Sequence, residues 1–430
     1  MLTILFVSLG NAGHVHPLLG IACALKRRNH RVVFATDKRW KGSFEKFGIE
    51  EQLYDEKAEV ADEHKFDILT TKGAENAFEM LSLTPKEHLT WNCSYYKYCF
   101  ESSKSIEKIL SEIVSNVKPD VILTVNLVPY ACLLKLRLPI VQVFTPNPLF
   151  AFKDEKLPPC FFGLPIDDRS DLNSKREASL RPLWNEINEY LRERNLPLLR
   201  EYRLQHLSTN LNVYIYPQPL VKDYLRLCPL GDEWIGLDHS LRESHYTFRL
   251  PQNFKNEHEK LIFLSMGSLA SNIFGLMSRL VKILAKCKHK ITVVRGHFKE
   301  NYKLADNMWG EAFLPQLEII PIVDLVISHG GNNTFVETLY FGKPMIIMPL
   351  FADQFDNAQR AVEAKIGVKV NPFTVEENEL LDAIEMILND EDIVERVQNI
   401  SKQIRESKSM DSLMNKIEQV AKNPKFPSFV

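Results

Sequence analysis

The stretch best suited to chemistry is a glycine turn between an apolar run and a segment with helical periodicity. Ser328–Gly331 follow the apolar run 325–327, and Asn332–Thr334 open a periodic segment that ends near Gly342. A buried strand, a glycine turn and a helix opening on cap-type residues leave backbone N–H groups free under the positive end of the helix dipole. The pattern favours binding of an anion such as a phosphate. The same asparagine and threonine side chains would also serve as helix caps if nothing bound.

A histidine beside a second glycine turn could move a proton. Gly10–Gly13 follow the apolar run Leu2–Ser8 and precede His14, and His16 lies two residues further on. A neutral imidazole, with an ordinary pKa of about 6.5, can take a proton from a hydroxyl group at cellular pH. Most single histidines are structural or solvated, but a loop after the first strand lies at the sheet edge where open α/β folds bind ligands. His14 is therefore the candidate base, and His16 is the weaker one.

Both turns need repeated strand–helix units to position them. Residues 2–8, 31–36, 120–124, 140–144, 212–216, 260–264 and 291–295 read as strands, and residues 17–28, 106–117, 181–193, 274–286, 376–388, 393–408 and 411–422 as helices. Such alternation predicts parallel strands joined by right-handed crossovers. The stretches 57–104 and 146–165 lack a clear period, and we expect them to be functional loops.

Length and composition indicate two globular domains. A chain of 430 residues is too long for one ordinary core, and 45% apolar and 25% charged residues are typical of a soluble protein. The polar segment 238–259 is the predicted linker between an N-terminal domain, 1–237, and a C-terminal domain, 260–408. Residues 409–430 are expected to form a helix and tail that pack back on the N-terminal domain. A net charge of -2 gives no footprint for nucleic acid.

No metal, cofactor or membrane anchor is expected. The seven cysteines are scattered without metal-ligand spacing and read as reduced thiols, and Asp390–Asp392 precede a helix, where capping explains them better than metal binding. The N-terminal apolar run has no basic residues before it, so a strand explains it better than a signal peptide. No run reaches the roughly 18 apolar residues of a membrane span. These features predict a cytoplasmic protein, which we expect to be a monomer.

Three separated motifs together resemble the UDP-glycosyltransferase family. His329–Glu337, Gly342–Pro344 and Phe351–Gln354 are similar to its donor-binding signature, Gly13–Pro17 to its N-terminal catalytic motif, and Ser265–Ser268 to its phosphate-side loop. The order and approximate spacing are kept across both halves of the chain. The resemblance implies the GT-B fold, in which two doubly wound, Rossmann-like α/β domains with parallel sheets face each other across a cleft. The compact chain is similar to bacterial-type members.

The resemblance places a UDP-sugar on the C-terminal half. It implies that the diphosphate is held by Gly267, Ser268, His329, Gly331, Asn333 and Thr334, whose N–H and side-chain groups would stabilise the leaving charge. Glu337 would accept hydrogen bonds from the ribose, although an acid there could also simply complement the helix dipole. Phe313, with Gln316 nearby, stands where the family usually stacks a tryptophan on uracil. Asp353 and Gln354 would contact sugar hydroxyls, unless Asp353 only caps the next helix.

The acceptor side departs from the family pattern at one position. The family commonly pairs its catalytic histidine with an aspartate just after the strand that begins here at Asp120, but Val125 or Asn126 occupies that place. Asn126 or Thr124 could orient His14 instead, or the acceptor could be acidic enough to need less help.

Aromatic residues in 91–100 and 149–162 are expected to line an apolar acceptor pocket, although burial in an ordinary core would also explain them. Trp91, Tyr95 and Phe150 are the candidates, and Thr145 would touch the sugar by its position in the family.

The sequence thus predicts an inverting enzyme that moves a hexose, with glucose as the first choice, from a UDP-sugar to a hydroxyl of a small lipophilic acceptor. A phenolic compound, another secondary metabolite or a xenobiotic would fit. Two alternatives stay open: a GT-B enzyme that acts on lipid or carotenoid acceptors, and a non-catalytic protein that binds a nucleotide sugar or a lipophile.

Overall fold

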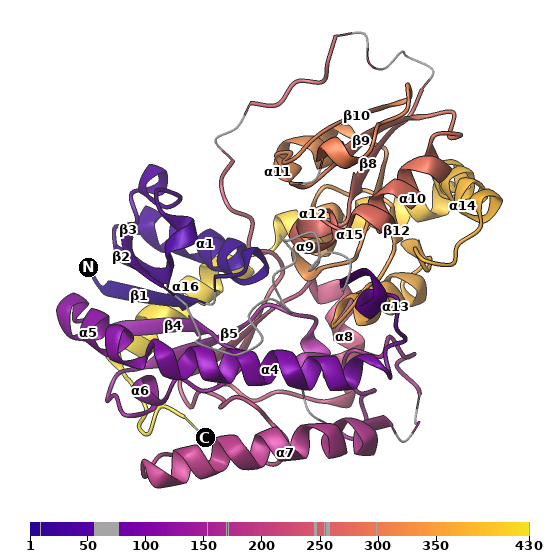
Figure 1. Cartoon of the computed structure of the whole chain (residues 1–430). Helices are drawn as coiled ribbons and strands as arrows, with labels where there is room; N and C mark the ends of the chain where they lie inside the picture. Colours follow the sequence, from indigo (N-terminus) through magenta and orange to yellow (C-terminus); the bar gives the residue numbers. More distant parts are fainter. Residues whose placement is uncertain are drawn as a thin grey trace.

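The computed structural model describes residues 1–8, 10–55, 77–152, 154–168, 170, 172–244, 247–252, 254, 259–297 and 299–429. Two all-parallel sheets, each with helices around it, form two lobes (Figure 1). The predicted pair of doubly wound α/β sheets is thereby confirmed. Of the proposed linker 238–259, residues 245, 246, 253 and 255–258 lie outside the described part of the chain.

The N-terminal sheet has seven parallel strands. Their spatial order is β3 (Glu50–Tyr54), β2 (Arg31–Asp37), β1 (Thr3–Ser8), β4 (Val121–Val125), β5 (Ile140–Phe144), β6 (Leu211–Ile215) and β7 (Trp234–Leu237). Every residue of β4, β5 and β6 is buried. Helices cover both faces of such a sheet, which is why its strands read as continuous apolar runs.

Two groups of helices cover the two faces of this sheet. Helices α1 (Ala12–Arg27) and α16 (Ser409–Lys422) share one core with the strands, and α4 (His88–Ser105), α5 (Glu107–Val117), α6 (Ala131–Leu134), α7 (Leu172–Glu193) and α8 (Gln218–Leu227) contribute to the core on the other face. Short 3-10 turns lie at η1 (Lys38–Trp40), η2 (Glu45–Phe47) and η3 (Pro148–Phe150).

The C-terminal sheet has six parallel strands. Their order is β10 (Met308–Glu311), β9 (Lys290–Val294), β8 (Leu261–Ser265), β11 (Leu325–Ser328), β12 (Met345–Ile347) and β13 (Gly367–Lys369). The helices of this half are α9 (Gly267–Ala270), α10 (Phe274–Leu284), α11 (Gln316–Ile319), α12 (Asn332–Tyr340), α13 (Gln354–Glu363), α14 (Glu377–Asn389) and α15 (Glu391–Glu406), with 3-10 turns η4 (Lys299–Asn301) and η5 (Ile320–Ile322).

The strand order of each sheet reverses next to its first strand. In the N-terminal sheet β1 lies between β2 and β4, and in the C-terminal sheet β8 lies between β9 and β11. Open α/β sheets bind ligands at the carboxyl ends of the strands beside such a reversal. Helices α1 and α12, which begin at these two places, contact each other between the lobes. The fold therefore brings the two predicted chemical turns together.

Parts of the predicted loop 57–104 and of the predicted turn 10–13 are helical instead, and residues 57–76 of that loop lie outside the described part of the chain. Residues 88–105 form α4, whose buried face carries Asn92, Ser102 and Ser103 beside its aromatic residues, so no apolar period is visible in the sequence. The predicted turn at 10–13 is also wrong in part, because α1 already begins at Ala12 and places His14 in its first turn. Pro17 lies inside this helix and removes the N–H that would otherwise bond to the Gly13 carbonyl oxygen.

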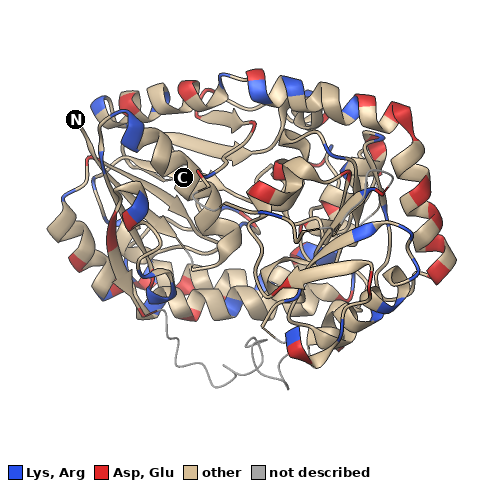
Figure 2. Cartoon of the chain, turned by 90° about the horizontal axis from the view of Figure 1, so that it is seen from above, with Lys and Arg blue, Asp and Glu red and all other residues tan. Residues whose placement is uncertain are grey.

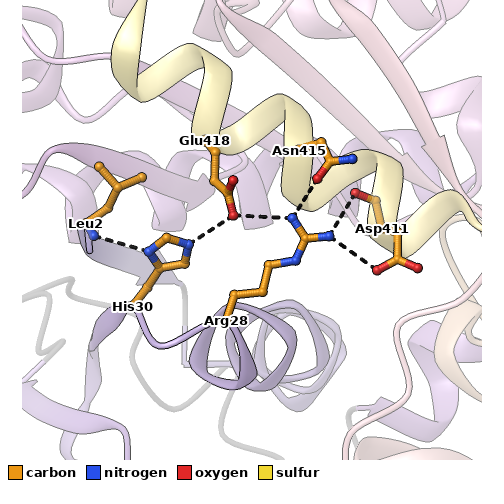
Figure 3. A network of polar contacts seen from close by, with 6 residues as sticks. All are labelled: Leu2, Arg28, His30, Asp411, Asn415 and Glu418. Carbon is orange, nitrogen blue, oxygen red and sulfur yellow. Dashed lines mark hydrogen bonds and ion pairs between the residues drawn. The ribbon is translucent and has the colours of Figure 1, made fainter.

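The C-terminal helix α16 returns to the N-terminal lobe, where it packs beside α1 (Figures 1 and 3). The Arg28 guanidinium donates hydrogen bonds to Asn415 Oδ1 at 2.6 Å and to Glu418 Oε1 at 3.2 Å. His30 Nδ1 accepts from the Leu2 N–H at 3.1 Å, so its Nε2 carries the proton toward Glu418, 3.1 Å away. These contacts support the proposed return of residues 409–430 to the N-terminal domain.

Charges are mixed over the surface. In the view of Figure 2, Lys and Arg residues and Asp and Glu residues are both spread over the molecule, in keeping with the net charge of -2. Within the described ranges, no helix has both the length and the apolar character needed to cross a membrane.

Candidate active site

The turn between β11 and α12 is built around the ring of His329. A Cβ atom on Gly267 or on Gly331 would lie 2.5 Å from His329 Nε2, so only glycine fits at both positions while the ring stays there. Gly267 and Gly330 also adopt left-handed backbone angles, with φ of 78° and 79°. Burial lowers the pKa of His329 to about 4, which leaves the ring neutral at physiological pH. Gly267, His329 and Gly331, three of the predicted donor residues, thus lie together.

The start of α12 is open to an anion. Its N-cap residue is Gly331, which has no side chain to satisfy the first amides. Asn333 Nδ2 lies 3.3 Å from the Gly13 carbonyl oxygen, and Thr334 Oγ1 lies 3.3 Å from Gln316 Nε2. Within the described residues, the Asn333 and Thr334 side chains therefore bond elsewhere and do not cap the helix, an arrangement that suits an anion at the helix N-terminus.

Glu337 is a buried, paired carboxylate and not a surface acid that complements the helix dipole. It is only 5% exposed, accepts a hydrogen bond from Arg242 Nη1 at 2.9 Å, and accepts another from Gln316 Nε2. The predicted residues Gln316, Thr334 and Glu337 therefore form one polar group beside the start of α12. Arg242 was missed by sequence reasoning, because it lies in the polar linker, where nothing in the local pattern points to a partner.

The side chain of Phe313 is largely exposed to solvent. Its side chain is 63% exposed, although phenylalanine is usually buried. It lies in the loop between β10 and α11, three residues before Gln316. An exposed ring beside a cluster of hydrogen-bonding groups is suited to stacking on a planar ligand.

The partner of His14 is Thr145. The His14 Nδ1 atom lies 2.6 Å from Thr145 Oγ1, and burial lowers the pKa of His14 to about 4. Asn126 and Thr124, the predicted orienting residues, are buried, but Asn126 Oδ1 and Thr124 Oγ1 make no hydrogen bond within the described part of the chain. The hydrogen-bond partner of His14 is therefore the residue after β5, and not the residue after β4.

His16 points away from this pair. Its ring packs edge-on against Trp40, with centroids 5.5 Å apart. Burial, and then the charge of Arg242, lower the pKa of His16 to about 3. The packing supports His14 as the stronger candidate base.

Asp353 and Gln354 lie where α13 meets the N-terminal lobe. The backbone N–H of Asn147 donates to Asp353 Oδ2 at 2.8 Å, and burial raises the pKa of Asp353 to about 6. Asp353 precedes α13, but its side chain makes no cap hydrogen bond, so the capping alternative is wrong. Gln354 Oε1 accepts from the Leu350 N–H at 3.0 Å and from the Phe351 N–H at 3.2 Å. Asp353 therefore lies at the junction of the lobes, and Gln354 holds the loop that precedes α13.

The predicted acceptor aromatics fall into two groups. Trp91 and Tyr95 stack with centroids 5.6 Å apart, and the Tyr95 hydroxyl accepts a hydrogen bond from Asn11 Nδ2 at 2.8 Å, directly before α1. This places the first pair close to the start of the helix that carries His14. Phe150 instead stacks on Phe161, with centroids 5.6 Å apart.

Other polar features have structural explanations. Asp390 Oδ1 accepts from the Ile393 N–H at 2.9 Å, which confirms helix capping for Asp390–Asp392.

A cavity of about 520 Å³ lies between α8, α13 and α15. It is lined by Lys222, Arg360, Arg396 and their neighbours, and none of its lining residues belongs to the predicted site.

Two Rossmann-like lobes of parallel strands, with the glycine turn before α12 on one and the part-buried His14 on the other, have the architecture of a GT-B glycosyltransferase. The sequence model of the family "UDP-glucoronosyl and UDP-glucosyl transferase" matches residues 197–420, just over half of the chain. The chain belongs to this family.

Similar proteins agree with the assignment. The uncharacterized UDP-glucosyltransferase YojK of Bacillus subtilis (strain 168) is 22% identical over 97% of this chain and 98% of its own length. Human UDP-glucuronosyltransferase 1A1 is 29% identical, but the match covers 47% of this chain and 39% of the human enzyme. The crystal structure of the glycosyltransferase of kitacinnamycin shares the fold, with a TM-score of 0.71 and 18% identity over 97% of this chain and 98% of that one. The predicted GT-B fold is confirmed.

Proposed function

We propose that this glycosyltransferase moves a hexose, with glucose as the first choice, from a UDP-sugar to a hydroxyl of a small lipophilic acceptor, with inversion. The observation that carries the proposal is the meeting of α12 and α1. Asn333 Nδ2, at the open start of α12, lies 3.3 Å from the carbonyl oxygen of Gly13, the residue before His14. A diphosphate on α12 and a hydroxyl on His14 would therefore have the sugar between them.

His14 acts as the general base. Because burial keeps the imidazole neutral, it can accept the acceptor's hydroxyl proton at physiological pH. The resulting oxygen attacks the anomeric carbon in line with the departing diphosphate, and one displacement inverts the configuration. The negative charge that gathers on UDP is stabilised by the amides at the start of α12, by the Ser268 amide and by His329.

The donor groups fit a uridine nucleotide. Phe313 supplies the exposed ring for the base, and Glu337, fixed by Arg242 and Gln316, supplies carboxylate oxygens for the ribose hydroxyls. Asp353 and Gln354 would receive the sugar hydroxyls. Thymidine diphosphate, which lacks the 2′-hydroxyl, is the matched comparison, and we expect it to bind more weakly than UDP because Glu337 then loses a partner.

The acceptor groups fit an apolar molecule with one hydroxyl. The stacked Trp91 and Tyr95 offer aromatic surface near His14, and Phe351 of the C-terminal lobe packs edge-on against Trp91 with centroids 5.9 Å apart. A phenol satisfies both requirements, because its ring can stack and its hydroxyl is more acidic than that of an alkyl alcohol. That acidity would lessen the demand on a base whose hydrogen-bond partner, among the described residues, is a hydroxyl and not a carboxylate.

The test combines binding and turnover. Calorimetry with UDP and thymidine diphosphate, followed by UDP release from UDP-glucose over a panel of phenols, should show UDP binding and product with a hexose mass increment. The reaction should proceed in the presence of a chelator. Binding of UDP without turnover of any acceptor would favour the alternative of a non-catalytic binder, which the missing carboxylate beside His14 motivates. Turnover that survives His14→Ala would overturn the base assignment.

A further inference from the structure

The contact between His14 and Thr145 fixes the orientation of the ring and accommodates the tautomer that a general base needs. Thr145 is 3% exposed, and the contact with His14 Nδ1 at 2.6 Å is the hydrogen bond that its hydroxyl makes. When Nδ1–H donates to Thr145 Oγ1, Nε2 is left with a lone pair that can receive a proton. The same hydrogen bond persists after Nε2 is protonated. A hydroxyl thus directs the ring without adding the negative charge that a carboxylate would supply.

The backbone of Thr145 is held from the other lobe. Asn332, the first residue of α12, donates through Nδ2 to the Thr145 carbonyl oxygen at 2.8 Å and to the Ile215 carbonyl oxygen at 3.0 Å. These two carbonyls lie at the carboxyl ends of the neighbouring strands β5 and β6. The two N–H bonds of a single amide therefore satisfy both strand ends.

Asn333, the residue after Asn332, holds the helix that carries His14. Pro17 has no N–H, so the carbonyl oxygen of Gly13 lacks its usual donor four residues later in α1. Asn333 Nδ2 lies 3.3 Å from that oxygen. Adjacent asparagines at the start of the predicted donor helix thus hold the backbone on both sides of the His14–Thr145 contact.

We infer that Thr145 is a positioning residue that orients His14 as the base, and that Asn332 completes this arrangement only when the two lobes close. The inference rests on the proposed role of His14. Its consequence is that α12 does two things: its amides receive the diphosphate, and its first side chain aligns the base across the cleft. Closure would then couple donor binding to base alignment, as in enzymes that assemble their catalytic groups by induced fit.

Three variants of Thr145 test the orienting role. Thr145→Val keeps the shape but removes the hydroxyl, and it should lower kcat by about 10- to 100-fold with little change in the KM for UDP-glucose, because a misaligned base loses most of its effect. Thr145→Ser should rescue kcat to within about threefold, because it restores the acceptor for Nδ1–H. Thr145→Asp should raise the pKa of His14, and so move the acidic limb of the kcat/KM profile to higher pH.

Asn332→Ala tests the contact between the lobes. It should lower kcat as Thr145→Val does, and the double variant should be little worse than either single variant, because both act on one contact. UDP affinity, measured by calorimetry, should stay within about threefold of the parent, since Asn332 contacts only strand-end carbonyls. Asp223→Asn is the matched control: it weakens the pair of Asp223 in α8 with Arg360 in α13, another contact between the lobes, and should not shift the pH profile.

The outcomes separate this inference from the proposed function. If His14→Ala abolishes turnover while Thr145→Val keeps the parent kcat and pH profile, the positioning role is overturned and the base assignment stands. If the effects of Asn332→Ala and Thr145→Val on kcat add fully, the specific link through Asn332 is overturned. The same holds if Asp223→Asn lowers kcat as much as Asn332→Ala does. If turnover survives His14→Ala, the proposed base itself fails. Far-ultraviolet circular dichroism together with UDP binding identifies any variant that is merely misfolded.

Discussion

The carboxylate of Asp353 accepts a hydrogen bond from the backbone N–H of Asn147 at 2.8 Å, so a residue predicted to bind the donor sugar is held by the opposite lobe. The contact lies two residues from Thr145, at the same junction. A sugar hydroxyl at Asp353 would either share this carboxylate with the Asn147 N–H or replace that N–H. A residue predicted to bind the donor therefore also makes a contact between the lobes.

Asp353 should make the folded state less stable as the pH rises. Burial raises its pKa from 3.8 to about 6, so between these values the folded protein binds more protons at this site than the unfolded chain does. Stability contributed by this group is therefore lost as the pH rises from about 4 to about 6. Asp353→Asn keeps an oxygen for the Asn147 N–H and should gain stability relative to the parent over that window. Urea unfolding at pH 4.5 and 7.5 measures the difference, and an equal difference at both pH values would contradict the expectation.

Gly331→Ala should damage donor binding more than folding. The added Cβ would lie 2.5 Å from His329 Nε2, so the ring must leave its place in the turn between β11 and α12. Losing one well-placed hydrogen bond to a charged group costs about 1.5–3 kcal/mol, so UDP affinity should fall at least tenfold. Calorimetry with UDP measures the loss, and thermal unfolding shows whether the fold is kept. An unchanged UDP affinity would remove His329 from the donor site.

Arg242→Met should be strongly destabilising. The change leaves Glu337 as a buried carboxylate with Gln316 as its remaining donor, and breaking a buried ion pair in this way costs about 3–5 kcal/mol. The matched control is Arg27→Met, which breaks an exposed pair with Glu243 in the same linker and should cost no more than about 1 kcal/mol. Urea unfolding compares the two variants. Equal effects would mean that Arg242 and Glu337 are not paired in solution.

Ile417→Ala should show that α16 is part of the N-terminal core. Ile417 is fully buried in the same cluster as Phe6 and Leu18, and truncating such a side chain typically costs about 2–5 kcal/mol. Met386→Ala, at a side chain that is 46% exposed on α14, is the control and should cost less than about 1 kcal/mol. If the two variants unfold at the same urea concentration, α16 is a dispensable tail.

Much of the framework was predictable from local pattern. The strand predicted at residues 140–144 coincides with β5. Of the six other predicted strands, two differ from the observed strand by one residue at one end, and four are shifted by one residue at both ends. Buried parallel strands read as apolar runs, and glycine turns mark their ends, so periodicity and turn chemistry suffice for them. Helix α4 was missed because its buried face mixes Asn92 and Ser102 with aromatic residues.

By itself the sequence determined the fold class and the glycine turn before α12, because each depends on residues that are neighbours along the chain. Only the tertiary structure decided which groups meet. Thr145 faces His14 from 131 residues away because β5 lies next but one to β1, with β4 between them, and that order is a property of the sheet. Asn332 reaches Thr145 across two separate sheets, 187 residues apart in sequence. Hydrogen bonds of this kind depend on how strands and lobes are arranged, and no local pattern encodes that arrangement.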